Sequence, residues 1–301
     1  MSAFSHQPIF SMLHRSSRAT LLALVSNLVL FACAAPALAA VYTPITGDSS
    51  YKIVFDDEFN GTSLNTSTKW HAPVTQHDNT YPNSNMMQML VGNVSVHDGL
   101  LDMMVTRGPT PDGSSYGTAA ITTRGNTISG QPISVYWEAR IKNMDQAFGL
   151  MSGFWTDTAP NWNFPENDFN EYWQAQSIYS TRQNYHDGAN WVLQSNYNTG
   201  MNLGAAYHVY GVLWTPTAIT YYIDGVQTAQ TTTNTNRSNP QFYAILNASA
   251  GGGGIWPNRT TLIPNHMLVD YVHVYSAQAG AVAITPDANY GGPGDNGTGV
   301  P

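Results

Sequence analysis

The sequence predicts an all-β protein built as a sandwich of two antiparallel sheets. After about forty residues, short runs rich in Val, Ile, Tyr, Thr and Trp alternate with Gly, Asn, Asp and Pro, and no long stretch has apolar residues at helical spacing. Two pairs of runs are joined by the hairpin dipeptide Asp-Gly, at Asp98-Gly99 and Asp224-Gly225. Many short strands joined by close turns are typical of a β-sandwich or barrel.

The first 39 residues predict a secretory signal peptide. Arg15 and Arg18 precede an apolar run from Leu21 to Ala32, and Ala37-Leu38-Ala39 offers small residues for cleavage. The run is short for a bilayer span, so a membrane anchor is the weaker alternative, and a lipoprotein signal at Cys33 is a minor one. We therefore expect a secreted or periplasmic protein.

Composition limits the partners of the exported chain. Without the first 39 residues it keeps 9 Lys and Arg and 19 Asp and Glu, a net charge of 9 − 19 = −10, and it loses its only cysteine. The fold must therefore be stable without a disulfide. Acidic charge without a basic cluster argues against nucleic acid and anionic membranes as partners. The 12% of aromatic residues suits a neutral, hydroxyl-rich ligand, and we expect a monomer.

The predicted strands follow one another closely, each bounded by Gly, Pro, Asn, Asp or Ser. In the first half they cover residues 51–55, 93–97, 100–105, 119–123, 134–141 and 152–156. In the second half they cover residues 207–214, 218–223, 226–229, 242–246 and 267–275. Residues 40–278 are therefore expected to form one sandwich domain, and residues 279–301, rich in Gly, Pro, Asn and Asp, a flexible tail or linker.

The stretch Pro165–Trp173 contains the candidate chemistry. Three carboxylates, Glu166, Asp168 and Glu171, lie within six residues of a chain in which only 10% of residues are charged. In a regular strand Glu166 and Asp168 share a face, and Glu171, five positions after Glu166, points to the other face. A β-bulge adds one residue and brings all three to the same face. The alternative is a solvated acidic strand edge.

Paired carboxyl groups on one face suit the hydrolysis of a glycosidic bond. A retaining glycosidase uses two of them about 5–5.5 Å apart, one as nucleophile and one as general acid/base. Four paired strand steps separate two backbones by about 13 Å, so the long Glu side chains have to converge. A third carboxylate between them raises the pKa of the acid/base.

This stretch resembles the glutamate-x-aspartate-x-x-glutamate signature of family 16 glycoside hydrolases, jelly-roll sandwich enzymes of the laminarinase, agarase and carrageenase kind. Five other parts of the chain between Asp48 and Ser276 resemble that family in the same order: residues 56–61, 137–142, 153–155, 212–216 with 222–225, and 269–275. The two residues between Asp168 and Glu171 match the bulged branch of the family. Lichenases and xyloglucan transglycosylases belong to the other branch and are therefore less expected.

The resemblance implies a substrate cleft on the concave face of one sheet. There, Glu166 is the implied nucleophile, Glu171 the acid/base and Asp168 the residue that tunes the pair. The candidates for sugar contact are Asn85, Trp155, Trp162, Trp173 and His186. Core packing is the alternative for the tryptophans, and a loop position without a role is the alternative for His186.

No cofactor is expected for catalysis. The resemblance does place Glu58, Gly99 and Asp270 where many members of the family bind a structural calcium ion, with carboxylate and backbone oxygens as ligands.

The chain departs from the family pattern at several positions. Asn167 and Asn170 stand where aliphatic residues usually face the core, and buried Asn needs hydrogen-bond partners. Met86 and Ala120 stand where Glu and Arg are common. These departures put the substrate in doubt more than the reaction.

The sequence therefore predicts a secreted, retaining endo-glycoside hydrolase acting on a β-linked polysaccharide, with β-1,3-glucan favoured. Three alternatives stay open. They are a transglycosylase, a hydrolase of another polymer such as a galactan or a bacterial exopolysaccharide, and a non-catalytic carbohydrate-binding module.

Overall fold

The computed structural model describes residues 44–72, 86–124, 127–129, 134–158, 165–173, 177–187, 190–235, 241–251, 255–277 and 283–285. All of them belong to one unit, Ala40–Pro301, so the predicted signal peptide lies outside the described residues. Apart from one 3-10 turn, η1 (Val91–Asn93), every element of this part of the chain is a β-strand, as the sequence predicts. Among the same residues, no helix has the length and apolar character of a membrane span.

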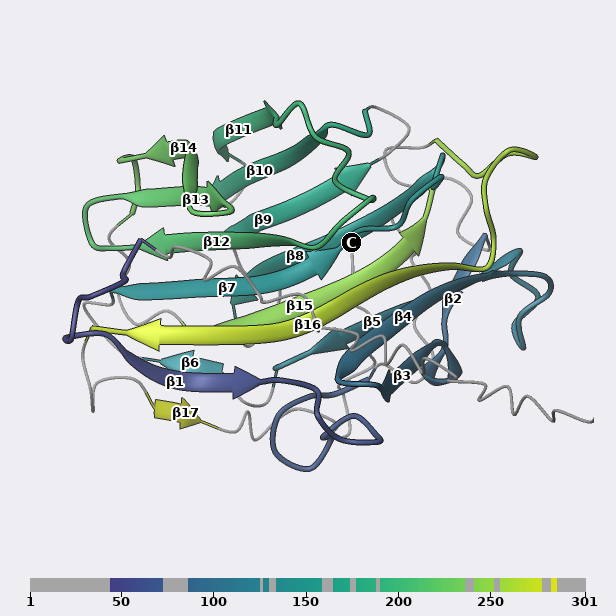
Figure 1. Ribbon diagram of the computed structural model, residues 1–301, viewed down its shortest axis with the longest axis horizontal. Coiled ribbons are helices and arrows are strands. Elements are labelled where there is room, and N and C mark those ends of the chain that lie inside the picture. Colours follow the sequence, from purple (N-terminus) through teal and green to yellow (C-terminus); the bar gives the residue numbers. More distant parts are fainter. Residues whose placement is uncertain are drawn as a thin grey trace, which may run out of the picture. The chain divides into compact units, whose positions relative to one another are not determined.

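One layer, the outer sheet, has the strand order β3–β4–β16–β7–β12–β13–β14, and β1 also pairs with β16 (Figure 1). Its strands are β1 (Lys52–Asp57), β3 (Val94–His97), β4 (Leu100–Arg107), β7 (Val135–Lys142), β12 (His208–Trp214), β13 (Ile219–Ile223), β14 (Val226–Thr231) and β16 (Asn265–Ser276).

The second layer, the carboxylate sheet, has the order β5–β15–β8–β9–β10–β11, with β6 beside β15, β17 beside β6 and β2 parallel to β5. The end of β4 pairs with β5 and joins the two layers. The strands are β2 (Met87–Met89), β5 (Tyr116–Thr122), β6 (Thr127–Ser129), β8 (Leu150–Thr158), β9 (Glu166–Trp173), β10 (Ser180–Asp187), β11 (Asn190–Asn198), β15 (Gln241–Ala250) and β17 (Ala283–Thr285).

Both predicted Asp-Gly hairpins are confirmed. Asp98 and Gly99 connect β3 to β4 with φ values of 54° and 75°, and Asp224 and Gly225 connect β13 to β14 with 50° and 78°. Two successive residues with positive φ define the type I′ turn, whose twist matches that of the flanking strands.

Two neighbouring strands of the carboxylate sheet, β10 and β11, were not predicted from the sequence. Their residues are mostly polar, so the alternation of apolar and polar residues that indicates a half-buried strand is missing. The short β17 also pairs with β6, inside the segment predicted as a tail; residues 286–301 lie outside the described part.

The main core lies between the two sheets. Phe169 of β9 packs edge-on against Phe154 of β8, with ring centroids 4.8 Å apart, and 6.3 Å from Trp137 of the outer sheet. All three side chains are buried, and burying a side chain of this size contributes about 1.5–3 kcal/mol. The strand that carries the three carboxylates is therefore fixed to the core through Phe169.

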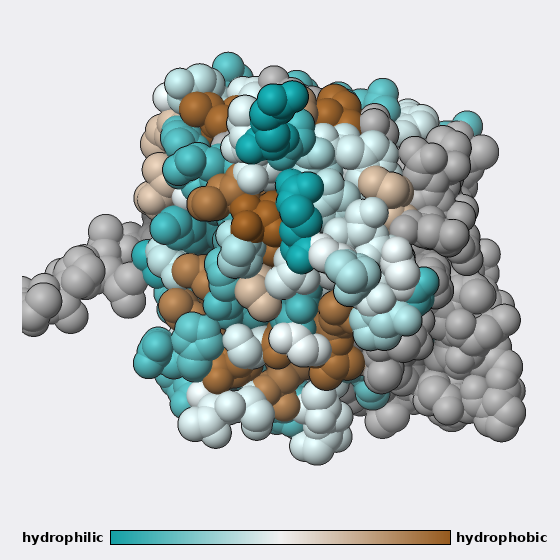
Figure 2. Space-filling model, turned by 90° about the vertical axis from the view of Figure 1, so that its right-hand side faces the viewer, coloured by the Kyte–Doolittle hydropathy of each residue, from teal (hydrophilic) through white to brown (hydrophobic). Residues whose placement is uncertain are grey.

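The surface exposes few large apolar side chains. In the described residues these are Ile53, Val91, Phe148, Tyr179, Trp191, Met201, Val226 and Leu262. On the face shown in Figure 2, hydrophobic areas are interrupted by hydrophilic and neutral residues. Scattered exposed apolar residues need no explanation, but an exposed tryptophan is less common.

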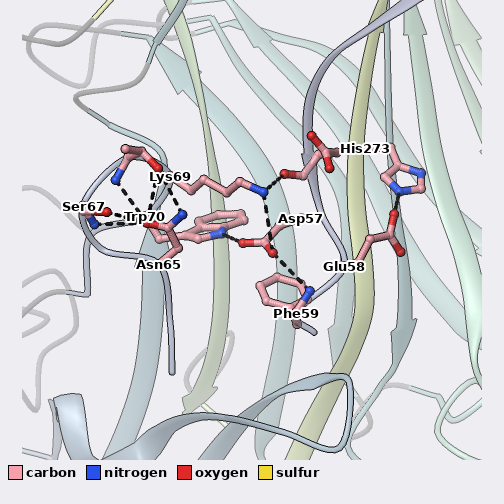
Figure 3. Close-up of polar contacts among 10 residues, drawn as sticks. Asp57, Glu58, Phe59, Asn65, Ser67, Lys69, Trp70 and His273 are labelled. Carbon is pink, nitrogen blue, oxygen red and sulfur yellow. Dashed lines mark hydrogen bonds and ion pairs between the residues drawn. The ribbon is translucent and has the colours of Figure 1, made fainter. Parts of the chain in front are cut away.

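A buried carboxylate at the end of β1 fixes the chain that follows (Figure 3). The indole Nε1 of Trp70 donates to Asp57 Oδ2 at 2.7 Å, and the backbone N–H of Phe59 donates to Asp57 Oδ1 at 3.1 Å. The next residue, His71, forms a bridge with Thr122 at the end of β5. This contact connects β1 of the outer sheet to the edge of the carboxylate sheet.

On the exterior of the outer sheet, His273 of β16 lies between two carboxylates. Its Nε2 is 2.5 Å from Glu58 Oε1, as Figure 3 shows, and its Nδ1 is 3.4 Å from Oε1 of the buried Glu138. Burial alone lowers the pKa of His273, but the hydrogen bonds to Glu138 and Glu58 outweigh it, and the pKa is raised. Tyr271 and Tyr275 also face this imidazole.

A raised histidine pKa predicts a loss of stability at alkaline pH. The stabilisation is complete below the unfolded-state pKa of about 6.5 and disappears as pH rises through the folded-state value. We therefore expect the free energy of unfolding of the wild type to fall, relative to His273→Gln, as the pH of urea titrations rises from about 6.5 through the raised folded-state pKa. His97→Gln is the comparison: Asp98 and Asp102 also raise the pKa of His97, but this residue is exposed, so its effect should have the same sign and be smaller. A constant difference across this range would contradict the assignment.

Candidate active site

Strand β9 is bulged at Phe169. On neighbouring β8, Trp155 pairs with Asp168, but Phe154, the residue before it, pairs with Asn170. Phe169 therefore has no partner on β8, and the register with β10 shifts at the same place. The predicted bulge is confirmed.

The bulge sends the side chains of β9 into two environments. Asn167, Phe169, Asn170 and Tyr172 are fully buried toward the outer sheet. Glu166, Asp168, Glu171 and Trp173 lie on the opposite side, which we call the carboxylate face. Asp168 is 4% exposed, and the two glutamates are half-buried. All three carboxylates thus share one face, as predicted.

The two asparagines on the core side form hydrogen bonds, although Asn167 Nδ2 has no partner among the described residues. Asn170 Nδ2 donates to Asn143 Oδ1 at 2.9 Å, and its Oδ1 accepts from Thr181 Oγ1 at 2.8 Å. Asn167 Oδ1 accepts from the hydroxyl of Tyr221, in β13 of the outer sheet, at 2.5 Å. Polar residues replace the expected aliphatic ones here because the core behind the bulge is hydrogen-bonded from both sheets.

Two side chains of β10 draw the carboxylates together. Asn184 Nδ2 donates to Asp168 Oδ2 at 3.1 Å and also to Glu171 Oε2. His186 Nε2 lies 3.7 Å from both Glu166 Oε1 and Asp168 Oδ2. Glu166 pairs with His186 and Glu171 with Arg182, four residues apart on β10, so their backbones are about 13 Å apart. Asp168 lies between the two glutamates and contacts both Asn184 and His186.

Burial and mutual repulsion shift the titration of the pair. Burial raises the pKa of Glu166 to about 9, with further contributions from nearby carboxylates, first Asp168. Burial and then Asp168 raise the pKa of Glu171 to about 8, while Arg182 and the hydrogen bond from Asn184 oppose the rise. Both shifts favour the protonated form, and because the two glutamates interact, the pair keeps one proton in the neutral range, where an ordinary glutamate is ionised.

Trp173 and Arg182 form the border of the face near Glu171. The guanidinium carbon of Arg182 lies 4.4 Å from the centroid of the Trp173 ring. Trp173 is thus on the predicted face, but the cation covers one side of its ring. Arg182 is the positive charge on this side of the site, and the sequence did not identify it.

Trp155 is also on the carboxylate face, beside Asp168, but it is only 8% exposed. Its Nε1 donates to Asn247 Oδ1 at 3.0 Å. Asn247 fits because its neighbour on β8 is Gly153, where a Cβ would approach Asn247 Oδ1 to 2.2 Å. On the other side Asn247 pairs with Ala120, where the family pattern led us to expect an arginine. This amide is a further residue that the sequence did not identify.

The remaining candidates for sugar contact have different outcomes. His186 lies on the carboxylate face, beside Glu166 and Asp168. Asn85 and Trp162 lie outside the described residues. The sequence missed Asn184 because β10 was not recognised as a strand: residues 180–184 are all polar, so no alternation was available as a signal.

The predicted calcium ligands lie at the exterior of the outer sheet. Glu58 is hydrogen-bonded to His273, and Asp270 forms an ion pair with Arg140 at 2.5 Å. Gly99 lies in the β3–β4 turn near Asn60. Both carboxylates thus already have partners that a calcium ion would have to replace, so this set fits an ion poorly. The calcium site stays a prediction.

Comparison with known proteins identifies a family and several similar proteins. The family model described as Glycosyl hydrolases family 16 matches residues 91–273. The chain is 28% identical over 275 residues to glucan endo-1,3-beta-glucosidase A1 of Niallia circulans, covering 75% of this chain and 38% of that protein. It is 27% identical over 146 residues to the endo-1,3-1,4-beta-glycanase ExsH of Rhizobium meliloti (strain 1021), covering 48% and 30%. The chain spans less than half the length of these curated relatives.

Solved structures of similar fold include two glucanases. The endo-beta-1,3-glucanase from Pyrococcus furiosus matches with a TM-score of 0.62 and 24% identity, over 75% of this chain and 94% of that chain. SCLam, a non-specific endo-beta-1,3(4)-glucanase from family GH16, matches with a TM-score of 0.65 and 22% identity, over 76% and 92%. At this identity the likeness supports the fold, a jelly-roll sandwich, and leaves the substrate open.

The polar core behind the bulge gives a test of the local structure. We expect Asn170→Leu to lower the free energy of unfolding by about 2–4 kcal/mol, because Thr181 and Asn143 each lose a buried hydrogen bond. The same change at exposed Asn196 should stay within about 0.5 kcal/mol. Denaturant unfolding of both variants measures the difference. A neutral or stabilising Asn170→Leu would mean that this core tolerates the aliphatic residue.

Proposed function

The chain belongs to family 16 of the glycosyl hydrolases, and we propose that it is an exported, retaining endo-β-glucanase that cleaves β-1,3-glucan. The observation that carries this proposal is the bulged strand, which holds Glu166, Asp168 and Glu171 on one face of the carboxylate sheet. The names of the relatives support a β-1,3-linked glucan, since the curated relative from Niallia circulans is an endo-1,3-beta-glucosidase.

In the proposed mechanism, Glu166 attacks the anomeric carbon and forms a glycosyl-enzyme ester. The bond to the leaving oxygen breaks with its electron pair, and Glu171 donates the proton to that oxygen. Glu171 then removes a proton from water, which attacks the same carbon and releases Glu166. Two displacements at one carbon restore its original configuration.

The pKa order alone would give the opposite roles, since Glu166 has the higher value, about 9 against about 8. The two glutamates interact, however, so the loss of a proton from one makes the other release its proton less readily. We assign Glu166 as nucleophile from its place in the motif. His186, 3.7 Å from Glu166 Oε1, supports this choice because it can stabilise the ionised carboxylate.

The charge of the carboxylate face favours a neutral polymer. Glu166, Asp168 and Glu171 converge there, and the buried Asp157 adds its charge to their field. Arg182 supplies a positive charge near Glu171. A sulfated or carboxylated chain would be repelled by these groups, whereas a glucan is not.

A second candidate is an enzyme for mixed or related linkages. The similarity to an endo-1,3-1,4-beta-glycanase favours it, as does the fold shared with a non-specific glucanase. A substrate panel with product sizing separates the candidates. Hydrolysis produces short oligosaccharides and reducing ends from the polymer that fits, whereas a transglycosylase makes longer chains with little reducing sugar.

The carboxylates provide the direct test. We expect protein without the first 39 residues to release reducing sugar from linear β-1,3-glucan, and Glu171→Ala to reduce kcat by about 10²–10⁴-fold. Glu166→Ala should lower activity to background. A carbohydrate-binding module would show no turnover in any of these proteins.

Azide rescue assigns the roles. Azide should react at the face left open in Glu166→Ala and give an α-glycosyl azide, whereas in Glu171→Ala it should attack the glycosyl-enzyme and give the β-azide. NMR of the product distinguishes the two. The reverse pattern would exchange the roles of the two glutamates, and wild-type turnover in either variant would remove the mechanism.

Asn184 gives a prediction for the pH dependence. Its hydrogen bond lowers the pKa of Glu171, so its loss in Asn184→Leu should raise that pKa. Because the acid must be protonated to act, we expect the alkaline limb of kcat/KM to move to higher pH, and kcat to fall about 10-fold or more as Glu171 loses its position. Asn60→Leu, an exposed site beyond β1, is the control. An unmoved alkaline limb would show that Asn184 does not act on the proton donor.

A further inference from the structure

Trp191 of β11 is a partly exposed aromatic residue on the carboxylate face. It is 54% exposed, and its ring centroid lies 3.5 Å from that of His186. Directly paired residues in an antiparallel sheet point to the same face. His186 pairs with Glu166 on one side and with Trp191 on the other, so the three side chains form a row across β9, β10 and β11. These strands lie next to one another in Figure 1.

The row sets the distance from the reacting atoms. Trp191 is two strand spacings from Glu166, about 10 Å measured between backbones. The sugar whose anomeric carbon lies at Glu166 is therefore too far away to contact Trp191. In an extended chain that crosses the strands, a sugar farther along the chain can contact it.

The other residues of β11 that share this face with Trp191 are uncharged. On the same face of β11, the residues that follow are Gln194, Asn196 and Asn198, all exposed amides. Amides both donate and accept hydrogen bonds, as sugar hydroxyls do. An exposed aromatic plane next to neutral amides suits a pyranose ring, which has an apolar C–H face and a rim of hydroxyls.

A purely structural role for Trp191 is the simpler alternative. In that case the indole only holds His186 in place, and its exposed surface has no partner. Contact with His186 accounts for part of the ring but leaves about half of the side chain in water. Burying that apolar surface against a ligand is favourable.

We propose that Trp191 is the platform for a glucosyl unit at an outer subsite, so that the substrate-binding surface extends across β10 to β11. The proposal rests on the proposed function, because it takes a neutral β-glucan chain as the ligand. Trp191 is a specificity-determining residue in this arrangement, not a catalytic one. Its contact exists equally in the ground state and the transition state.

Uniform binding of this kind has a definite kinetic signature. Its loss raises KM and leaves kcat unchanged. We expect Trp191→Ala to raise KM for linear β-1,3-glucan about 10-fold, at an unchanged pH profile. Trp191→Tyr keeps an aromatic plane and should retain most of the affinity. Val226→Ala, at an exposed apolar residue in β14 of the outer sheet, is the control and should match the wild type.

Direct binding separates the platform from the chemistry. In the Glu171→Gln background, linear β-1,3-gluco-oligosaccharides of increasing length are titrated by calorimetry, with and without Trp191→Ala. The parent should gain affinity at the length that reaches β11, and the Trp191→Ala protein should lack that step while binding shorter chains equally.

Three outcomes would overturn the proposal. Equal affinity of both proteins for every length would show that Trp191 contacts no sugar, while leaving the proposed function intact. A lower kcat with a shifted pH profile in Trp191→Ala would show that it acts through His186. If even the parent bound no β-1,3-glucan of any length, the substrate of the proposed function would be wrong. The proposal that Trp191 binds a glucosyl unit of that substrate would then be wrong too.

Discussion

The single extra residue at Phe169 is the constraint on which the site depends. A regular strand cannot place Glu166 and Glu171 on one face, because they are five positions apart. The extra residue of the bulge brings Glu166 and Glu171 to the same face. It also lets two successive residues, Phe169 and Asn170, point into the core. Phe169 supplies apolar burial between the sheets, and Asn170 supplies hydrogen bonds. The position of the three carboxyls is thus fixed by contacts on the opposite side of the strand.

Gathering three carboxylates at one place is electrostatically unfavourable, and the neighbouring strand reduces that cost. Asn184 donates to Asp168 and Glu171, and His186 stands beside Glu166 and Asp168. Burial, and then the repulsion that remains, raise the pKa of both glutamates. This is useful for a glycosidase, because one carboxyl must keep its proton near neutral pH until the leaving oxygen takes it.

The carboxylate sheet divides its tasks by strand. Strand β9 carries the reacting groups, β10 positions them, and β11 presents Trp191 with uncharged amides on the same face. On the other side of β9, Trp155 and Asn247 are linked by a hydrogen bond in a buried setting. The side chains that position the carboxyl groups and the exposed side chains that could contact a sugar therefore lie on different strands. Residues of the binding surface can then change without disturbing the carboxyl groups.

The sequence by itself determined the all-β class, both hairpins, most strands and the three carboxylates with their bulge. These features depend on local patterns: alternation, Asp-Gly turns and the parity of spacing within one strand. Only the tertiary structure decided which residues surround the carboxylates. Asn184 and Trp191 come from β10 and β11, whose polar residues hide the strand pattern because one side faces the site and the other a partly polar core. His186 was a candidate from the resemblance, but its place beside Glu166 and Asp168 depends on the same strand pairing. The partners of Asn167 and Asn170 were equally hidden, since Thr181 meets β9 only through strand pairing, and Tyr221 and Asn143 only when the chain folds.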